Sequence, residues 1–478
     1  MTQDRYISPS LLIGGEWVSQ TGAEGPVINP ATGERIGSVP LADAALIDRA
    51  LAAAESGFEI WRKTALQDRA QIMKRAAGLL RERLEEAARH MTIEQGKPLA
   101  ESRAEMESCA ALLEWCPDEA ARIEDRELPE RAGFERLTVR KEPIGPVAAF
   151  SPWNFPASLA GRKTASALSV GCSVIVKPAE ETPACFGYVA RALQEAGLPD
   201  GVLNVLYGDP AEVSSRLIDS PVIRKIAFTG STAVGSKLAA QAGARAKPCV
   251  MELGGHAPVV VFDDADIERA VKLSVASKFR NAGQVCVSPT RFFVHDKVYD
   301  AFVDAFVQGA SALKVGDGLA PDTQMGPLAN QRRVEAIDEI IRDAVSHGAD
   351  KRLGGELPNV PGHYYPATVL AGVPDSARVM QEEPFGPLAV MNRFSDTDEA
   401  IAKANGTPFA LGAYAFTRSK ERAAQIGEAL DAGMVGVNGY SIVFTDSPLG
   451  GRRQSGFGSE GGREGIEAYL INKFVSEH

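Results

Sequence analysis

The run VAAFSPWNFPASLAGRKTASALSVGCSVIVKPAE, residues 147–180, holds a short β-rich stretch, a helical stretch and a second β-rich stretch. The alternation continues to Val261. Strands are predicted at Val147–Phe150, Ser173–Val176, Val202–Leu206, Lys225–Phe228 and Val250–Leu253, and helices near 157–170, 182–196, 211–219 and 232–242. This order is typical of a mostly parallel sheet wrapped by helices, which binds nucleotides at the C-terminal ends of its strands. The sequence therefore predicts a doubly wound α/β domain.

A second α/β unit is expected further along, with helices near 297–313, 331–347 and 396–404 and strands near 388–393, 412–416 and 434–437. Residues 11–40 have the pattern of short strands and turns. Residues 47–115 predict two or three amphipathic helices, interrupted at Gly96-Lys97-Pro98. The charged segment Asp118–Arg140 ends in an alternating run, so we expect it to pair with a part of the chain outside its own lobe.

Length and composition limit the class of protein. A chain of 478 residues is too long for one ordinary core, so we expect at least two lobes. With 45% hydrophobic and 24% charged residues, the chain reads as a soluble globular protein. A net charge of −11 argues against nucleic acid or an anionic membrane as partner, since both require clustered Lys and Arg. A small anionic substrate held by local arginines is still allowed.

The residues Met1–Arg5 lack the basic-then-apolar order of a secretory signal, and no segment approaches the roughly 18 apolar residues of a membrane span. We therefore expect a cytoplasmic protein. The histidines show no H-x-x-x-H spacing and the cysteines no C-x-x-C pair, so neither a metal site nor a disulfide framework is predicted. The cysteines are Cys109, Cys116, Cys172, Cys185, Cys249 and Cys286.

Cys286 lies in the run Asn281-Ala282-Gly283-Gln284-Val285-Cys286-Val287-Ser288-Pro289, just after a helical pattern over Ile267–Phe279. A thiol in a short turn after a helix is a plausible nucleophile. The alternative is that Cys286 is a small buried hydrophobic residue.

Other polar motifs also fall where predicted elements end. They are Ser151-Pro152-Trp153-Asn154-Phe155-Pro156, Lys177-Pro178-Ala179-Glu180, the run from Phe228 to Gly235, Glu252-Leu253-Gly254-Gly255 and Glu382-Glu383-Pro384-Phe385-Gly386-Pro387. Taken singly, Asn154 reads equally as a turn residue, Glu252 as a structural carboxylate and Ser231 as an ordinary helix N-cap. Their shared position at element ends favours a common site.

Through these motifs, in this order and over almost the full length, the chain resembles the aldehyde dehydrogenase superfamily. Within it the sequence is most similar to succinate semialdehyde and α-ketoglutarate semialdehyde dehydrogenases. The resemblance implies two doubly wound α/β domains and a small β arm that bridges subunits of a homodimer or homotetramer. The implied bounds are 1–122 and 143–254 for the NAD-binding domain, 255–466 for the catalytic domain, and 123–142 and 467–478 for the arm.

The same resemblance implies a chemistry. The Cys286 thiolate would add to an aldehyde carbon, and the Asn154 side-chain amide with the Cys286 backbone N–H would stabilise the resulting oxyanion. Glu252 would activate the water that releases a free acid. NAD is the implied cofactor, with NADP as an alternative. Its expected contacts are Trp153, Lys177, Glu180, Gly230, Ser231, Leu253, Glu383 and Phe385.

Three residues point to the substrate. In succinate semialdehyde dehydrogenases, residues that match Arg162, Arg280 and Ser455 hold the substrate carboxylate, a role that suits the paired donors of arginine. We therefore expect succinate semialdehyde first, α-ketoglutarate semialdehyde second and glutarate semialdehyde third. If the arginines instead form surface ion pairs, a broad aliphatic or aromatic aldehyde dehydrogenase is the alternative.

Two alternatives from other classes remain. One is a non-redox thioester or ester hydrolase that uses Cys286 and Glu252, and the other is a non-catalytic member of the fold. Ser288 stands where some succinate semialdehyde dehydrogenases have a second cysteine, so no disulfide within this loop is possible.

Overall fold

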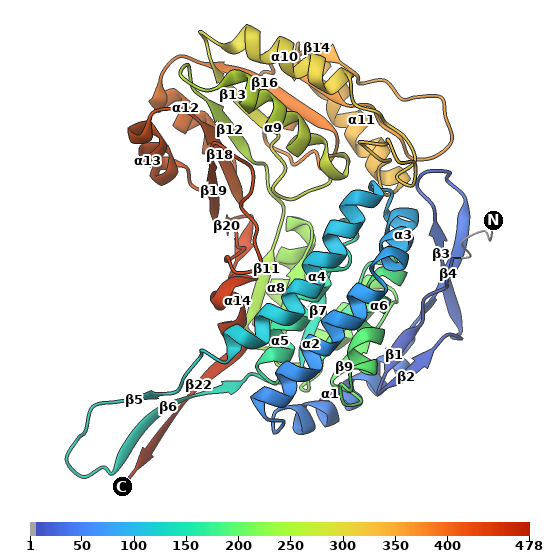
Figure 1. The fold of residues 1–478 in the computed structure, drawn as a ribbon, viewed down its shortest axis with the longest axis vertical. Helices are drawn as coiled ribbons and strands as arrows, with labels where there is room; N and C mark the ends of the chain where they lie inside the picture. Colours follow the sequence, from blue (N-terminus) through green and yellow to red (C-terminus); the bar gives the residue numbers. More distant parts are fainter. Residues whose placement is uncertain (1–5) are drawn as a thin grey trace.

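The computed structural model describes residues 6–478, and the run Met1–Arg5, which we had tested for a secretory signal, lies outside these residues. Two α/β lobes follow one another along the long axis of the molecule, and a narrow β arm extends from one of them (Figure 1). Each lobe has its own buried apolar core. The expectation of at least two lobes is therefore confirmed.

The first lobe contains an eight-stranded sheet. Its strands are β1 (Leu11–Ile13), β2 (Glu16–Val18), β7 (Val147–Phe150), β8 (Val174–Lys177), β9 (Leu203–Val205), β10 (Lys225–Thr229), β11 (Cys249–Glu252) and β21 (Gly456–Phe457). The spatial order is β2-β1-β9-β8-β7-β10-β11-β21, and the five strands from β9 to β11 are parallel. These strands run 3-2-1-4-5 in chain order, as in dinucleotide-binding folds, so the ligand crevice is expected where β7 meets β10.

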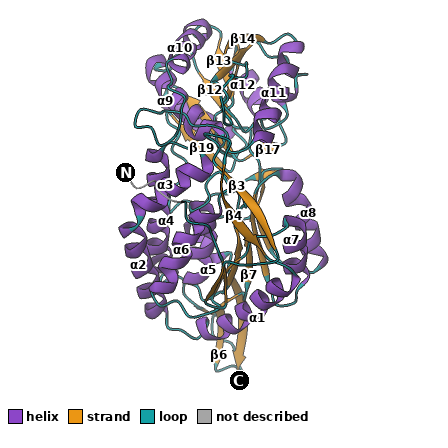
Figure 2. Ribbon diagram, turned by 90° about the vertical axis from the view of Figure 1, so that its right-hand side faces the viewer, coloured by secondary structure: helices purple, strands orange, loops and turns teal. Residues whose placement is uncertain are grey.

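Helices cover both faces of this sheet. They are α1 (Ala44–Trp61), α2 (Leu66–Glu82), α3 (Leu84–Gln95), α4 (Leu99–Ala120), α5 (Ser158–Ser169), α6 (Pro183–Glu195), α7 (Pro210–Asp219) and α8 (Thr232–Ala244). Figure 2 shows α1, α7 and α8 on one side and α2 to α6 on the other. Because the central strands are covered on both faces, they are buried throughout and mostly apolar, as in β7 and β8.

The prediction of two or three helices before residue 120 was wrong, because the structure has four. The break between α2 and α3 falls at Arg83, with φ −108° and ψ 10°, and involves neither glycine nor proline. No ordinary sequence signal marks such a break. Along residues 6–478 no helix combines the length and the apolar character that crossing a membrane requires.

The second lobe contains a seven-stranded sheet of strands β12 (Pro258–Val261), β13 (Arg291–His295), β14 (Asp350–Leu353), β15 (Thr368–Ala371), β16 (Leu388–Phe394), β18 (Gly412–Phe416) and β19 (Met434–Val437). The order is β14-β15-β16-β13-β12-β18-β19, and all but β14 run parallel. The helices are α9 (Ile267–Phe279), η1 (Arg280–Gly283), α10 (Tyr299–Ser311), α11 (Gln331–Ser346), η2 (Arg378–Met380), α12 (Thr397–Ala404) and α13 (Lys420–Ala429).

The remaining elements are β3 (Ala23–Ile28), β4 (Arg35–Leu41), β5 (Arg126–Glu127), β6 (Arg136–Pro143), β17 (Phe409–Ala410), β20 (Arg452–Arg453), α14 (Gly462–Glu467) and β22 (Leu470–Glu477). Strands β22, β6 and β5 form the arm, with the C-terminus near its tip (Figure 1). The charged segment therefore does leave its lobe, and β6 pairs with β22 along its whole length.

One expected boundary needs correction. Residues up to 466 were assigned to the catalytic domain, yet Gly456 and Phe457 pair with β11 of the first sheet. Ile466 is also part of the first core. The chain thus returns to the first lobe before it enters the arm.

Candidate active site

A cavity of about 480 Å³ lies where the C-terminal ends of β7, β10 and β11 face the second lobe. The predicted site residues that line it are Trp153, Asn154, Gly230, Ser231, Leu253, Cys286, Glu383 and Phe385. They come from both lobes. The cavity therefore occupies the crevice that the strand order predicts.

The loop before Cys286 has an unusual backbone. After α9 ends, Asn281, Ala282 and Gly283 all have positive φ, of 49°, 51° and 73°. A Cβ on Gly283 would clash with the Gly386 carbonyl oxygen, so glycine is required here. The carbonyl of Gln284 accepts hydrogen bonds from Asn154 Nδ2 at 3.0 Å and from Asn281 Nδ2 at 3.3 Å. These contacts fix the loop against the first lobe.

Cys286 is half-buried at the edge of this cavity. Burial, with Glu252 and Glu383 nearby, raises the pKa of its thiol to about 12. In this state Cys286 is therefore a neutral thiol. Because only the thiolate is a strong nucleophile, reaction requires loss of that proton.

The turn that carries Asn154 is held from beneath by Lys97, which precedes α4, and by Glu105 of α4. Lys97 Nζ donates to the Asn154 carbonyl at 2.6 Å and forms a buried ion pair with Glu105, also at 2.6 Å. Glu105 in turn accepts from the backbone N–H of Ala157 at 2.9 Å. One hydrogen of the Asn154 amide is used by Gln284, which leaves the second for a ligand in the cavity.

Glu252 ends β11 and is 2% exposed, directly behind the cavity wall formed by Leu253 and Gly254. Its Oε1 has no hydrogen-bond partner among the described residues. Burial first, and then the negative charge of Glu460, hold the pKa of Glu252 well above its ordinary value. Arg162 and Lys163 act in the opposite direction.

Glu460 and Lys163 form a buried ion pair at 2.7 Å beside Glu252. Lys163 also donates to Thr229 Oγ1 at 2.5 Å, which joins α5 to the end of β10. Both charged side chains are almost fully buried. Removal of either one would leave an uncompensated buried charge.

On the cofactor side, Glu383 accepts a hydrogen bond from the Gly255 backbone N–H at 3.1 Å. A Cβ on Gly254 would lie 2.6 Å from the Glu383 carboxylate, so the glycine permits this approach. Burial raises the pKa of Glu383 to about 7. The carboxylate is thus placed inside the crevice rather than on the surface.

Phe385 has a φ of 43° and meets the edge of Trp153, with ring centroids 5.6 Å apart. Arg333 donates to the carbonyls of Pro384 and Phe385 and lies over the Phe385 ring at 5.7 Å. The two aromatic rings therefore form a supported apolar wall of the cavity.

Lys177 and Glu180 form an ion pair at 2.6 Å after β8, and Glu180 also accepts from the Gly208 backbone N–H at 3.1 Å. Ser231 caps α8 and accepts from Val234 N at 3.4 Å. The N-terminus of α8, next to Gly230, lies in the cavity wall, where its N–H groups favour an anion such as a pyrophosphate. Apolar rings, the Glu383 carboxylate and a helix N-terminus in one crevice fit a dinucleotide. Glu180 lines an adjoining cavity of about 760 Å³, which shares Asn330 and Arg332 with the first.

A second cavity, of about 370 Å³, lies on the other side of the cysteine loop. Val285, Val287 and Ser288 line it from the loop, Arg280 from η1 and Phe444 from the segment after β19. Cys286 therefore lies between a cofactor-side cavity and this one, which we call the substrate-side cavity.

Arg162 and Ser455 are not brought into either cavity. Arg162 is 5% exposed, and among residues 6–478 its nitrogens donate hydrogen bonds only to the Phe444 carbonyl, at 3.4 and 3.5 Å. Ser455 is fully buried, donates to the Gly254 carbonyl at 2.7 Å and accepts from Ala410 N at 2.9 Å. The role of Ser455 in binding a substrate carboxylate stays a prediction, and in this structure its hydroxyl is already used within the protein.

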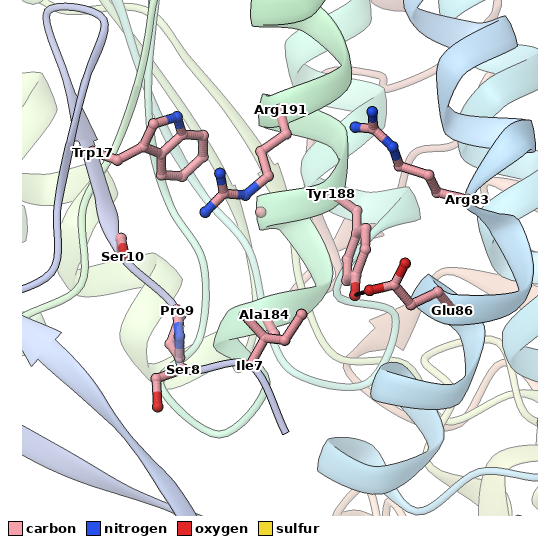
Figure 3. Close-up of a pocket in the computed structure, with 11 residues that line it drawn as sticks. Ile7, Ser8, Pro9, Ser10, Trp17, Arg83, Glu86, Ala184, Tyr188 and Arg191 are labelled. Carbon is pink, nitrogen blue, oxygen red and sulfur yellow. Dashed lines mark hydrogen bonds between the residues drawn. The ribbon is translucent and has the colours of Figure 1, made fainter. Parts of the chain in front are cut away.

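A further cavity, of about 250 Å³, lies beneath the N-terminal segment beside α6 (Figure 3). In it Arg191 stacks on Trp17 at 4.2 Å and Tyr188 donates to Glu86 at 2.9 Å. None of the predicted site residues lines this cavity.

Sequence reasoning missed several buried charged residues around the crevice. Lys163, Lys278 and Glu460 are buried and Arg333 is half-buried, and the sequence analysis singled out none of them. One available signal was the composition of α5, where Arg162 and Lys163 are the only charges among small and apolar residues. A helix of that composition is buried on most sides, so its charges must have partners.

Two doubly wound lobes, a dinucleotide crevice and a cysteine at the junction of two cavities define a thiol-dependent dehydrogenase. The model of the aldehyde dehydrogenase family matches residues 17–475, and the chain belongs to this family. It is an NAD(P)-dependent aldehyde dehydrogenase.

Relatives are similar over nearly their whole length. The 4-(hydroxymethyl)benzenesulfonate dehydrogenase TsaD1 of Comamonas testosteroni is 47% identical, over 98% of both chains. The NADP-dependent succinate-semialdehyde dehydrogenase GabD of Escherichia coli is 42% identical, over 97% of this chain and 96% of that one. The crystal structure of succinate-semialdehyde dehydrogenase from Burkholderia pseudomallei has a TM-score of 0.96 at 42% identity, and covers 100% of this chain and 99% of that one.

Proposed function

We propose that the enzyme oxidises an aldehyde with an anionic group a few carbons from the carbonyl, with succinate semialdehyde first, to the free acid. The observation that carries this proposal is Arg280 in the lining of the substrate-side cavity. Its guanidinium lies 5.4 Å from the Phe155 ring centre and has no carboxylate within 4.0 Å among residues 6–478. Glu101 is near, but its carboxylate accepts from Asn281 N instead. An arginine free of acidic partners suits a bound carboxylate.

Cys286 Sγ forms a bond to the aldehyde carbon after its thiol proton is lost, and the carbonyl oxygen takes the negative charge. The second hydrogen of the Asn154 amide and the Cys286 backbone N–H are the donors for that oxygen. No acceptor for this N–H is found in the part of the chain that the structure describes. Loss of one such donor typically costs roughly 10²–10³ in rate.

The bound nicotinamide cofactor supplies the hydride acceptor. Loss of hydride from the tetrahedral carbon leaves a thioester on Cys286. Glu252 then accepts a proton from a water molecule that attacks the thioester, and the acid leaves as the Cys286 sulfur is released. Because Glu252 lies behind Leu253 and Gly254, its side chain has to turn toward the cavity for this step.

Two relatives support an anionic substrate. GabD is named for succinate semialdehyde, and TsaD1 for an aromatic sulfonate. The substrate-side cavity also has aromatic residues in its lining, among them Tyr414, Tyr440 and Phe444. A sulfonate-bearing aromatic aldehyde is therefore the second candidate.

The arm supports a further proposal, that the enzyme is a homodimer or homotetramer. Phe474 and Ile471 of β22 are 58% and 44% exposed. Exposed apolar side chains on a small sheet are typical of an interaction surface.

The test compares succinate semialdehyde with butanal, and 4-formylbenzenesulfonate with benzaldehyde, in the presence of NAD or NADP. The absorbance of the reduced cofactor gives kcat/KM. In at least one of the two pairs, we expect kcat/KM to be higher for the anionic aldehyde than for the uncharged one. The ratio of the two kcat/KM values should be about tenfold for each 1.4 kcal/mol of differential binding. Arg280→Ala should reduce that ratio, chiefly through the anionic substrate.

The nucleophile is tested separately. Cys286→Ala should abolish cofactor reduction, whereas Cys249→Ala, at the other cysteine that is not fully buried, should retain it. Equal efficiency of wild type with the charged and uncharged aldehydes in both pairs would contradict the anionic substrate. Cofactor reduction by Cys286→Ala near the wild-type rate would contradict the nucleophile.

A further inference from the structure

A buried lysine lies against the substrate-side cavity and has no role in the steps above. Lys278 belongs to α9 and is 1% exposed. Its Nζ donates to Ser288 Oγ at 2.9 Å and reaches Thr290 Oγ1 at 3.5 Å. Ser288 lines the cavity together with Arg280, whereas Thr290 does not. The ammonium is therefore linked to the cavity through one hydroxyl.

The direction of this hydrogen bond fixes what Ser288 can offer. An ammonium group has three donors and no acceptor, so Ser288 Oγ must be the acceptor. The Ser288 hydroxyl hydrogen then has no acceptor among the side-chain and backbone groups of residues 6–478. Because Ser288 lines the cavity, that hydrogen is available to a molecule bound there.

Ser288 is also close to the nucleophile along the chain. Its backbone N–H donates to the Val285 carbonyl at 2.9 Å and closes a turn that contains Cys286 and Val287. The ends of such a turn lie within about 7 Å of each other. Ser288 therefore lies a few ångströms from the cysteine backbone, on the side of the loop that faces the substrate-side cavity.

We propose that Ser288, backed by the Lys278 ammonium, is a specificity-determining residue that donates a hydrogen bond to the anionic group of the substrate, beside Arg280. The inference rests on the proposed function, since it needs an anion in the substrate-side cavity. Carboxylate and sulfonate oxygens share the required acceptor chemistry. A hydroxyl whose oxygen already accepts from an ammonium is a stronger donor than an isolated one, because hydrogen bonds in a chain polarise each other.

The charged groups around Lys278 determine how the hydrogen bond between Lys278 and Ser288 responds to pH. Burial lowers the pKa of Lys278 to about 7, and Glu383 opposes that shift. His256 faces it from the segment after β11 and stays neutral, since its own pKa is held well below the ordinary value by burial and by Arg291. Above pH 7 the neutral amine can accept the Ser288 hydroxyl hydrogen, and the cavity loses its donor.

The test uses Ser288→Ala and Ser288→Thr, with KM and kcat measured for succinate semialdehyde and for butanal. We expect Ser288→Ala to raise KM for succinate semialdehyde by about tenfold, because a hydrogen bond to a charged group is lost. KM for butanal should change by less than about twofold. Ser288→Thr keeps the hydroxyl, so its KM for succinate semialdehyde should be close to that of wild type. In wild type, KM for succinate semialdehyde should rise with pH above about 7 while KM for butanal stays level.

The matched control is Thr290→Val. It removes the other hydroxyl near Lys278 but does not touch the cavity, so the preference for the acid should be retained. Lys278→Met should abolish the pH dependence of KM for the acid. If this variant does not fold, the comparison of Ser288→Ala with Ser288→Thr decides alone.

The outcomes separate this inference from the proposed function. If wild type shows no preference for either anionic aldehyde, the proposed function fails. If wild type prefers the acid and Ser288→Ala keeps that preference, or loses efficiency equally for both aldehydes, only the assignment of Ser288 is overturned. If 4-formylbenzenesulfonate responds to Ser288→Ala and succinate semialdehyde does not, the anion that Ser288 binds is a sulfonate, and the donor role stands.

Discussion

The pKa of Glu252, the proposed general base, is raised by the position of its carboxylate alone. It shares a nearly water-free space with the Lys163–Glu460 ion pair, and its pKa is raised by burial and by Glu460. The protonated form is therefore favoured at low pH, and the form that accepts a proton appears only as the pH rises through the raised pKa. Thioester hydrolysis should accordingly increase with pH.

We expect Glu460→Gln to move the pH midpoint of the hydrolysis rate downward. The substitution removes a negative neighbour and leaves Lys163 to favour the ionised Glu252, and both effects lower the pKa of Glu252. Glu467→Gln, at a half-exposed glutamate of α14 that pairs with Arg463, is the control and should leave the midpoint unchanged. The measurement is the single-turnover hydrolysis rate against pH, and an unmoved midpoint in Glu460→Gln would argue against Glu252 as the base.

Glu180 should set the choice of cofactor. Its carboxylate lies beside Lys177, where it would accept hydrogen bonds from ribose hydroxyls and repel a 2′-phosphate. We expect wild type to prefer NAD, and Glu180→Ser to reduce the ratio of NAD to NADP efficiency by about tenfold if the repulsion contributes ~1.4 kcal/mol. The neighbouring Glu181, which is paired with Arg332, provides the control Glu181→Ser. Comparable efficiencies of wild type with the two cofactors would show that Glu180 does not exclude NADP.

Residues at strand ends were the easiest to predict, because a parallel sheet brings its C-terminal turns together. Trp153, Gly230 and Leu253 meet in one cavity for that reason. Lys163 and Lys278 could not be found in the same way. A lysine in a helix reads as solvated until the packing around that helix is known, and the packing comes from segments distant in the chain.

The conformation of the loop that follows α9 depends on its backbone more than on its side-chain contacts. Gly283 has a φ of 73° and lies against the Gly386 carbonyl, which precedes β16. We expect Gly283→Ala to displace the cysteine loop, lose most activity and lower the melting temperature. Gly78→Ala is the matched control, because Gly78 lies in α2 with open space around it.

In Gly78→Ala an exposed helix interior gains a better helix former, so stability should rise by ~1 kcal/mol with activity unchanged. Thermal unfolding and kcat of both variants check the pair. A Gly283→Ala enzyme with normal activity would mean that the loop does not need its left-handed backbone.

The parallel strands of the first lobe were predicted better than the strands of the second lobe. β7 has the predicted bounds, and β8 to β11 differ from theirs by a residue or so. β12 was missed as a separate strand, because only the short segment from Leu253 to Ala257 separates it from β11. The chain passes from the first sheet to the second within this segment. β13, β14, β15 and α13 were missed too. β13 and β15 are short apolar runs, which do not by themselves distinguish a strand from a buried helix, and β14 is polar.

The arm leaves large apolar side chains exposed to solvent in a single chain. β22 pairs with β6 on one edge, while Phe474 and Ile471 remain exposed. If the arm forms the proposed subunit contact, Phe474→Glu should give monomers, because a charge would be buried at that contact. Leu357→Glu, at an apolar residue of similar exposure in the second lobe, should leave the mass unchanged. Light scattering after size-exclusion chromatography gives the mass, and a wild-type monomer would contradict the role of the arm.

The central claim is that an aldehyde is oxidised while bound to Cys286 and is released by water that Glu252 activates. Mass spectrometry of Glu252→Gln, mixed with NAD and succinate semialdehyde and then digested, tests it most directly. Glutamine cannot accept the proton from water, so the acyl group should accumulate. We predict a succinyl group on the peptide that contains Cys286, with one equivalent of reduced cofactor formed per subunit. Reduced cofactor that accumulates over many turnovers without an adduct, or an adduct on Cys249 instead, would contradict the account.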